Sequence, residues 1–546
     1  MSWHTHEVSN QFDELTDYKL MDSDVALAEA LEHAGAGWAK PWLRDYGETL
    51  GRADSFERAE LANRFAPQLQ AFDRRGRRQD KVEFHPAWHE LLAMYRGQGL
   101  VSLPFDNERS GRWTAFMAGF YLHGQVEAGS LCPATMTQAA IPLLRQEPAL
   151  WAQLGGKLFS REYDGRDLPL ERKASAWIGM GMTEKQGGSD VRANATQATP
   201  VAAGGRGSEY LLRGHKWFFS APMCDAHLVV AKTPDGAPSC FYVPRWRPDG
   251  SRNAVAIQRL KDKVGNCSNS SSEVEFHDAW GVLMGEPGRG IPTIIEMATY
   301  TRLNCVIGSA AMLRQGLAQS IAYTRQRQAF GKRLAEQPLM RAVLADLALE
   351  SEAALWLAAR LAQAFERGES AWKRIVTPAA KFWVCKRAVE ITGETMEVFG
   401  GNGYVDAGIM ARLFREAPVN SIWEGSGNVM CLDVARAILR EPEAWQCLQE
   451  ELRAMAGDDG ALRAALDELR DLAALPAAEL EIQGRRLAQQ LALTAQGCLL
   501  SAHAPQAVAD GFIASRLADG RWGGVVGALD ARKLDIDALL RRALPV

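Results

Sequence analysis

The hydrophobic pattern of the 546-residue chain changes its period twice, and this change constrains the fold more than any other feature. In the first 175 residues, apolar positions recur at intervals of three and four, as in helices; the clearest segments are 24–35, 111–129 and 137–156. From about 176 to 290 they form short runs rich in β-branched and aromatic residues, of which the clearest are 209–220, 226–233 and 239–245. The order helices, strands, helices argues against a doubly wound α/β sheet.

The helical period returns after residue 290 in long amphipathic stretches such as 337–367. Several such helices side by side predict a four-helix bundle over 291–440. Residues 441–546 are again helical in pattern and contain a break at 457–460, so we interpret them as an appended helical domain. We therefore predict an α+β multidomain protein with an N-terminal helical domain (1–175), a middle β domain (176–290), the bundle and the appended domain.

Composition and charge narrow the class of protein further. The formal net charge of −4 provides no global attraction to nucleic acid or to an anionic membrane. The first residues, MSWHTHEVSNQFDEL, lack the basic and apolar regions of a secretory signal, and no apolar run is long enough to span a bilayer. Nine scattered cysteines without a CxxC pair favour reduced, buried thiols. We expect a cytoplasmic protein that does not bind membranes.

The densest chemical signal is MGMTEKQGGSDV at 180–191, where the first helical block meets the strands. The hydroxyls of Thr183 and Ser189 can donate or accept hydrogen bonds, and Gly187 and Gly188 let main-chain N–H groups approach a ligand closely. The alternative is a polar turn at the end of a strand.

Four further segments carry side chains that could bind or react, and each also has a purely structural interpretation. They are GHKWFFSAP (214–222), RQRQAFGKRL (325–334), VFGGNGY (398–404) and SIWEGSGN (421–428). The aromatic residues of the first could simply pack a core, and the basic residues of the second could complement a helix dipole. The glutamate of the last could be an ordinary surface residue.

Several common sites are absent from the sequence. No GxGxxG follows a strand, and GxxxxGK[ST], GxSxG and HExxH do not occur. The ten histidines show no metal-ligand spacing, so we predict no metal site.

Taken together and in this order, the five segments resemble the acyl-CoA dehydrogenase family. MTEKQGGSD is similar to its first signature and RQAFGKRLAEQPLMRAVLADLA to its second. The resemblance implies bound FAD, with the flavin ring contacted by Met182, Thr183, Ser189, Phe218 and Ser220. It also implies that the pyrophosphate and adenosine of FAD, shared with a neighbouring subunit, are contacted by Arg327, Phe330, Gly400, Gly401, Ser426 and Asn428.

The same resemblance places Glu424 at the position of the catalytic base. A dehydrogenase of this kind removes the α-proton of an acyl-CoA thioester while the β-hydride passes to the flavin, which requires a base within hydrogen-bonding reach. Some members of the family carry the base at another position, on a bundle helix. This chain has Thr301 there, which is not a carboxylate, so Glu424 has no competitor for the role. Glu397 and the segment 185–187 depart from the family pattern.

The segments IGMGMTEKQGGSDV, LKDKVGNCSNSSSEVEF and PVNSIWEGSGNVMCLDV, together with HTHEVSNQ near the start and the C-terminal extension, are similar to an alkylation-response branch of the family. This resemblance implies an FAD-containing homotetramer built as a dimer of dimers and weak activity on branched acyl-CoA such as isovaleryl-CoA. It further implies binding to double-stranded DNA that protects it from alkylation damage.

The sequence also holds an argument against the DNA role. Residues 441–546 contain 11 basic and 16 acidic side chains, whereas duplex binding depends on clustered positive charge. The candidate DNA-binding residues are Arg436, Arg440, Arg485, Arg486 and Arg521. The competing interpretation is a metabolic acyl-CoA dehydrogenase without a DNA role; a structural scaffold without cofactor is a third.

Overall fold

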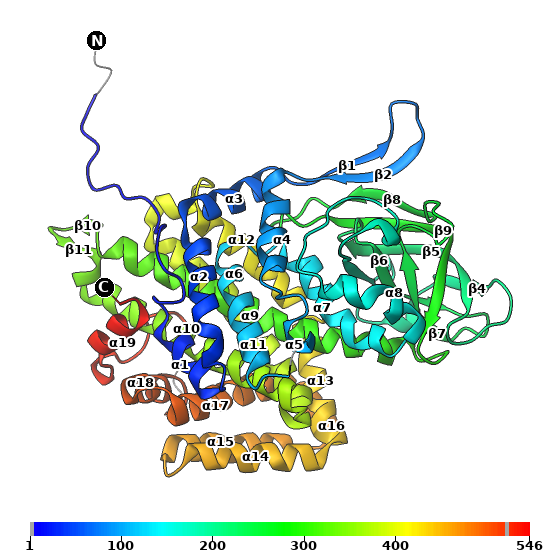
Figure 1. The fold of residues 1–546 in the computed structure, drawn as a ribbon. Helices are drawn as coiled ribbons and strands as arrows, with labels where there is room; N and C mark the ends of the chain where they lie inside the picture. The colour runs from blue at the N-terminus through cyan, green and yellow to red at the C-terminus, as the bar shows by residue number, and fades with distance from the viewer. Residues whose placement is uncertain (1–4, 107, 519–523, 546) are drawn as a thin grey trace. The chain divides into compact units, whose positions relative to one another are not determined.

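The computed structural model describes residues 5–106, 108–518 and 524–545, and the chain divides into two compact units (Figure 1). One, here called the bundle unit, comprises Met1–Ala53, Trp113–Val126 and Cys305–Val546; the other, the barrel unit, comprises Asp54–Arg112 and Glu127–Asn304. Each unit is formed by stretches that are separate in the chain. The four consecutive domains predicted from the sequence therefore remain a proposal.

The centre of the barrel unit is a seven-stranded sheet with the order β3-β5-β4-β6-β7-β9-β8. Strands β3 and β4 each pair with both β5 and β6, and β9 pairs with both β5 and β7, which closes the sheet into a barrel. The strands are β3 (Ile178–Gly181), β4 (Gln197–Pro200), β5 (Glu209–Ser220), β6 (Ala226–Lys232), β7 (Pro238–Pro244), β8 (Val255–Leu260) and β9 (Ser271–Met284). The predicted β domain is confirmed.

The interior of the barrel is filled by inward-facing residues from these strands. Phe219, Phe241 and Phe276 are at most 1–2% exposed and form one apolar cluster with smaller side chains such as Val229 and Leu283. Burial of such aromatic and branched side chains contributes about 1.5–3 kcal/mol each. The core therefore fixes the strand register from which the candidate site is built.

Helices complete the barrel unit: α3 (Ala53–Arg64), α4 (Pro86–Gly97), α5 (Leu103–Asp106), α7 (Leu131–Arg145), α8 (Pro148–Phe159) and the first part of α9 (Gly290–Thr324). The prediction of a purely helical first block is incomplete, because a hairpin of β1 (Gln68–Phe72) and β2 (Arg78–Glu83) lies within it. Arg78 donates to the Ile257 carbonyl at 2.6 Å and Asp80 accepts from the Ile257 N–H at 3.1 Å. These contacts hold the hairpin against β8.

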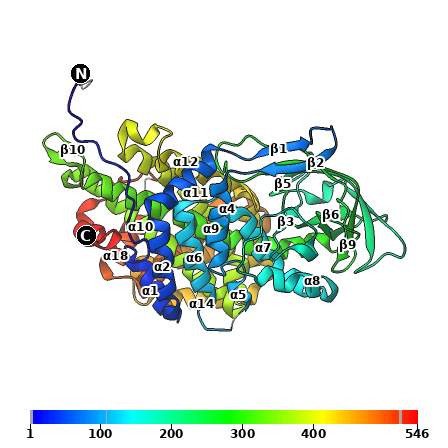
Figure 2. The ribbon, with the colours of Figure 1, turned by 45° about the horizontal axis from the view of Figure 1, so that its top comes forward.

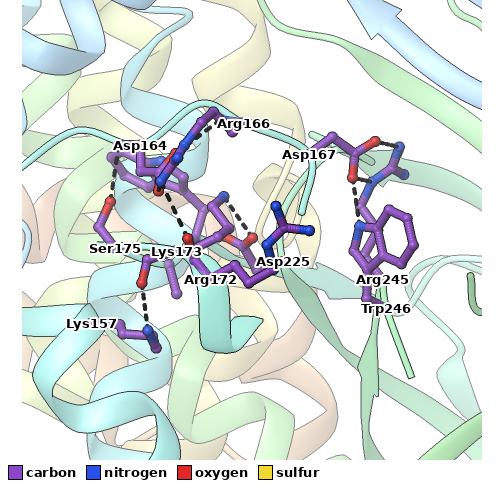
Figure 3. A network of polar contacts seen from close by, with 12 residues as sticks. Lys157, Asp164, Arg166, Asp167, Arg172, Lys173, Ser175, Asp225, Arg245 and Trp246 are labelled. Carbon is purple, nitrogen blue, oxygen red and sulfur yellow. Dashed lines mark hydrogen bonds and ion pairs between the residues drawn. The ribbon is translucent and has the colours of Figure 1, made fainter. Parts of the chain in front are cut away.

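The segment 160–176, which leads into β3, is held to the barrel by ion pairs (Figure 3). Asp167 accepts hydrogen bonds from Arg245, Trp246 and Arg252. The Lys173 ammonium lies 2.7 Å from Asp225, with both side chains under 10% exposed. A buried pair of this kind is strongly destabilised by removal of one partner, so the start of β3 is firmly placed.

The bundle unit is helical. It contains α1 (Val25–His33), α2 (Lys40–Gly51), α6 (Arg112–Val126), the end of α9, α10 (Pro338–Arg367), α11 (Thr377–Val398), α12 (Ile409–Ile422), α13 (Gly427–Arg440), α14 (Pro442–Ala456), α15 (Gly460–Ala473), α16 (Ala477–Ile482), α17 (Gly484–His503), α18 (Gln506–Arg516) and α19 (Ile536–Ala543). The predicted helix at 337–367 and the break at 457–460 correspond to α10 and to the α14–α15 turn.

A buried charge cluster joins the C-terminal helices to the bundle. Arg516 of α18 is fully buried and contacts Asp346 and Glu350 of α10, and Arg387 of α11 also contacts Glu350. Among the described residues, no helix has both the length and the apolar character needed to cross a bilayer. Seven of the nine cysteines lie buried.

Candidate active site

The loop of the first predicted motif follows β3 and is fixed by main-chain hydrogen bonds. The Thr183 carbonyl accepts from the Trp217 N–H at 2.8 Å, and the Met182 carbonyl accepts from Asn194 Nδ2 at 2.7 Å. Met182 and Thr183 are half-buried, and Ser189 is exposed at the far end of the loop. The structure thus brings the first predicted ring contacts next to the strand that carries Phe218.

A buried ion pair between Glu184 and Lys216 anchors this loop to β5. It was not identified from the sequence. Glu184 and Lys216 are both fully buried, with Nζ 2.7 Å from Oε1. Burial disfavours the charged carboxylate, but the Lys216 ammonium and main-chain N–H donors outweigh it and lower the pKa of Glu184 from 4.5 to about 2. Lys216 also donates to the Val230 carbonyl at 2.8 Å, so the pair joins the loop, β5 and β6.

A β-bulge in β5 presents two aromatic residues outward. The pairing with β9 shifts between Lys216 and Phe219, so that Trp217 and Phe218 together face one residue of β9. Phe219 packs in the barrel core, whereas Phe218 is 51% exposed. The Lys261 ammonium lies 3.7 Å from the centre of the Trp217 ring and 4.5 Å from that of Phe218. The packing interpretation therefore applies to Phe219 and not to Phe218.

Ser220 ends β5 beyond the bulge. It is half-buried, and its Oγ lies 3.5 Å from that of Ser271 on β9. Phe218 thus lies within the bulge and Ser220 beyond it, both on the strand that hydrogen-bonds to the Thr183 loop.

In the bundle unit, Glu424 lies in the short turn between α12 and α13. Its φ of 59° is in the left-handed region, which is uncommon for a residue with a side chain. The buried Lys381 of α11 donates from Nζ to the carbonyls on both sides of it, to Trp423 at 2.7 Å and to Gly425. A lysine within the apolar stretch KFWV of the sequence was the available signal for this role, and sequence reasoning missed it.

The surroundings of Glu424 are fixed by a chain of hydrogen bonds. The Trp423 indole N–H donates to Asn420 at 3.0 Å, and Asn420 donates to Ser309 on α9 at 3.2 Å. Burial raises the pKa of the Cys305 thiol well above its ordinary value; the Lys381 ammonium opposes this effect, and the Glu424 charge adds to it. Cys305 therefore remains a neutral thiol beside the carboxylate.

The remaining predicted FAD residues also lie in the bundle unit. Arg327 precedes a hairpin of β10 (Gln328–Ala329) and β11 (Lys332–Arg333), and Phe330 at its tip is 100% exposed with φ 51°. Gly400 (φ 61°) and Gly401 begin the turn at 400–404, and a side chain at either would meet no atom within 4 Å. Ser426 precedes α13 and Asn428 lies in its first turn.

The four candidate DNA-binding arginines that the structure describes lie on two helices, α13 and α17. Arg436 and Arg440 are exposed on α13, four positions apart. Arg485 donates to Asn428 at 2.8 Å, which links it to a predicted FAD residue, and Arg486 pairs with Glu468 at 2.6 Å. Arg521 lies outside the described residues. Thr301, at the alternative base position, is buried and donates to the Ala298 carbonyl at 3.0 Å.

Each unit offers groups that suit part of a flavin nucleotide. In the barrel unit, an exposed aromatic side chain such as Phe218 suits an apolar ring, and the half-buried Thr183 offers a hydroxyl. The open space around Gly400 and Gly401 and the guanidinium of Arg327 suit phosphate and ribose groups, which need close main-chain approach and positive charge.

Comparison with known proteins supports the same conclusion. Three family models match: the adaptive response protein AidB N-terminal domain over residues 10–165, the acyl-CoA dehydrogenase middle domain over 179–279, and the acyl-CoA dehydrogenase C-terminal domain over 288–439. The chain is 46% identical over 518 residues to the putative acyl-CoA dehydrogenase AidB of Escherichia coli K12, covering 94% of each chain.

Solved structures show the same fold. The Caenorhabditis elegans protein ACDH-11 in complex with C11-CoA superimposes with a TM-score of 0.84 at 23% identity, covering 99% of this chain and 93% of that one. An acyl-CoA dehydrogenase of Bacillus anthracis complexed with FAD gives a TM-score of 0.62 at 19% identity, covering 84% and 81%. The chain therefore belongs to the acyl-CoA dehydrogenase family, as an FAD-dependent enzyme similar to AidB.

Proposed function

We propose that Glu424 is the catalytic base of this dehydrogenase and takes the α-proton of a bound acyl-CoA thioester. FAD, when bound, supplies the acceptor for the hydride that leaves the β-carbon. Met182, Thr183, Ser189, Phe218 and Ser220 hold the flavin ring, and Arg327, Phe330, Gly400, Gly401, Ser426 and Asn428 hold the rest of the cofactor. The conformation of Glu424, fixed from both sides by Lys381, is the observation that supports this proposal most directly.

The chain's own groups account for the proton transfer. Lys381 orients the turn through two hydrogen bonds, which its ammonium donates to the main-chain carbonyls of Trp423 and Gly425. Cys305 stays protonated, so it does not compete with Glu424 for the proton. General-base catalysis by a positioned carboxylate contributes about 10²–10⁴-fold in rate.

Replacement of Glu424 by glutamine tests this assignment. Glu424→Gln should retain FAD but abolish the bleaching of the flavin absorbance on addition of isovaleryl-CoA, because the amide cannot accept the proton. Glu443→Gln, at an exposed glutamate of α14 outside the proposed site, is the matched control and should bleach at the wild-type rate. Undiminished bleaching by Glu424→Gln would eliminate the assignment.

We further propose that the substrate is a branched acyl-CoA such as isovaleryl-CoA and that the protein is a cytoplasmic homotetramer, a dimer of dimers. The similarity to AidB supports this proposal. The fully exposed Phe330 suits the subunit contact, since a large aromatic side chain is costly to leave in water. Turnover with a panel of acyl-CoA esters and light scattering of the FAD-loaded protein test the two parts separately.

A second proposed function is binding of double-stranded DNA that protects it from alkylation. Besides the similarity to AidB, the exposure of Arg436 and Arg440 on α13 favours it, because residues four apart share one helix face. A gel-shift titration should show binding that weakens as salt rises, and the double variant Arg436→Ala/Arg440→Ala should reduce the salt slope by about two. Absence of a shift even at low salt would leave the metabolic dehydrogenase as the function.

A further inference from the structure

The N-terminal strap, defined here as residues 10–18, runs along the bundle unit without helix or strand (Figures 1 and 2). Asp17 of the strap contacts Gly51 and Ala53, whereas the hydrogen bonds described below reach segments more than 290 positions away in the chain. Two of these segments, the β10–β11 hairpin and the turn at 400–404, carry residues of the proposed FAD site. The strap includes part of the HTHEVSNQ segment, for which the proposed function provides no role.

Asn10 binds the base of the hairpin through both ends of its amide. Its Nδ2 donates to the Gln328 carbonyl at 2.8 Å, and its Oδ1 accepts from the Gln328 N–H at 2.8 Å. The Asn10 carbonyl also accepts from the guanidinium of Arg327. The φ of Asn10 is 54°, a conformation that asparagine and glycine adopt more readily than other residues. Asn10 therefore fixes both the main chain and the side chain of the hairpin base.

The next residues of the strap bind the glycine turn and the start of α12. Gln11 Oε1 accepts from Asn402 Nδ2 at 2.9 Å. Glu14 accepts from the first N–H of α12, that of Ile409, at 2.7 Å, where a carboxylate also complements the helix dipole. A side chain at Gly408 would come within 2.3 Å of the Glu14 carboxylate, so Gly408 leaves room for it. Helix α12 ends next to Trp423 and Glu424.

The last part of the strap is anchored to α9. Gln319 donates to the Leu15 carbonyl at 2.9 Å and accepts from the Leu15 N–H at 2.8 Å. Tyr18 donates to Gln315 at 2.8 Å. Gln315 and Gln319 are both buried, which makes these bonds better protected from water than those of Asn10. The strap thus has a firm end on α9 and an exposed end at the hairpin.

We infer that the strap positions the adenosine half of the FAD site, with Asn10 as a positioning residue for Arg327. This inference rests on the proposed role of Arg327. Without the Asn10 amide, which holds the main chain of Gln328, the half-buried Arg327 and the short hairpin lose their fixed orientation, and FAD must order them on binding. Ordering of this kind reduces affinity without altering the groups that contact the ligand.

The test measures FAD affinity and apoprotein stability in the same variants of the full chain. Asn10→Gly preserves the left-handed conformation and removes only the side-chain bonds, and Asn10→Asp retains the acceptor for the Gln328 N–H. Tyr18→Phe is the matched control, because it removes a strap bond that does not touch the hairpin. Arg327→Ala tests the proposed contact itself. FAD is titrated into the apoprotein by flavin fluorescence, and thermal unfolding of each apoprotein is recorded.

Asn10→Gly should weaken FAD binding about five- to tenfold, Asn10→Asp by less, and Tyr18→Phe not at all, with unchanged apoprotein melting temperature for Asn10→Gly. If Arg327→Ala weakens FAD and Asn10→Gly does not, the strap inference is wrong while the proposed site stands. If neither weakens FAD, the role of Arg327 fails and the inference fails with it. A lowered melting temperature for Asn10→Gly would make the residue a structural one and also overturn the inference.

Discussion

Replacement of Lys381 by methionine should slow flavin reduction about tenfold without removing any group that touches the substrate. The perturbation deletes the ammonium that donates to the carbonyls of Trp423 and Gly425 and leaves a side chain of similar length in the same buried position. Glu424 lies between these two carbonyls at φ 59°. The variant therefore tests whether the orientation of the base depends on a residue of another helix.

The magnitude follows from two opposing free energies. A left-handed conformation costs roughly 1–2 kcal/mol for a residue with a side chain, and a hydrogen bond from a charged donor contributes about 1.5–3 kcal/mol. With both bonds the turn strongly prefers the observed conformation. Without the two hydrogen bonds, only the cost of the left-handed conformation remains. The conformation of Glu424 that can accept the proton then falls to about 3–15% of the population. The rate of flavin reduction should then fall about 7- to 30-fold.

Stopped-flow absorbance of the FAD-loaded protein mixed with isovaleryl-CoA measures this rate directly. Lys40→Met serves as the control. Lys40 pairs with Glu32, far from the Glu424 turn in the chain, and does not bind the carbonyl of Trp423 or Gly425. If Lys381→Met has full FAD content and its flavin is reduced at the wild-type rate, the reasoning that Lys381 holds the turn is refuted.

Three further predictions concern the buried charges. Lys216→Met should lower the free energy of unfolding by about 3–5 kcal/mol in urea, because Glu184 remains buried without its ammonium; a loss below about 1 kcal/mol would contradict this. The pKa of Glu184 in the folded protein, about 2, lies below the unfolded value of 4.5, so unfolding binds a proton in this range. The stabilisation by Glu184 is therefore complete above pH 4.5 and is lost as the pH falls toward 2. The free energy of unfolding in urea should fall less steeply over this pH range in Glu184→Gln than in the wild type. Parallel curves for the two proteins would count against the pair. Arg516→Met should cost about 3–5 kcal/mol because Asp346 and Glu350 lose a buried partner, whereas Arg486→Met, which removes an exposed pair with Glu468, should cost about 0–1 kcal/mol; equal losses would disprove the distinction.

The elements that follow from local pattern were predicted well from the sequence. The run at 209–220 coincides with β5, and the amphipathic stretch at 337–367 with α10. The β1–β2 hairpin was not predicted, because its sequence is largely polar and its position depends on Arg78 and Asp80 contacting a strand some 180 residues later. Periodicity contains no information about such contacts.

The candidate site divides in the same way. The motif residues were found from their resemblance to a family, whereas Lys381, the Glu184–Lys216 pair and Asn10 were not. Lys381 contacts carbonyls 42 and 44 positions away, and Asn10 contacts a residue 318 positions away. A main-chain carbonyl or N–H has no side-chain signature in the sequence, so the partners of Lys381 and Asn10 could not be identified before the fold was known.

Uncommon backbone conformations occur at or beside proposed site residues in each of the two units. In the described part of the chain, eight residues other than glycine have positive φ, and five of them are asparagine or aspartate, which tolerate this region. The other three are Ala221, Phe330 and Glu424. Glu424 and Phe330 are proposed site residues, and Ala221 directly follows Ser220.

Two of these three unfavourable conformations are held by a contact from a distant segment, and the third lies in a hairpin held at its base. The Ala221 N–H donates to the Ser270 carbonyl at 2.9 Å, Lys381 holds the carbonyls around Glu424, and Asn10 binds Gln328 at the base of the hairpin whose tip is Phe330. Strained residues persist only where the surrounding structure determines their conformation, and they concentrate at functional sites. The coincidence of strain with the proposed flavin and base positions is thus an argument for the site that is independent of the sequence motifs.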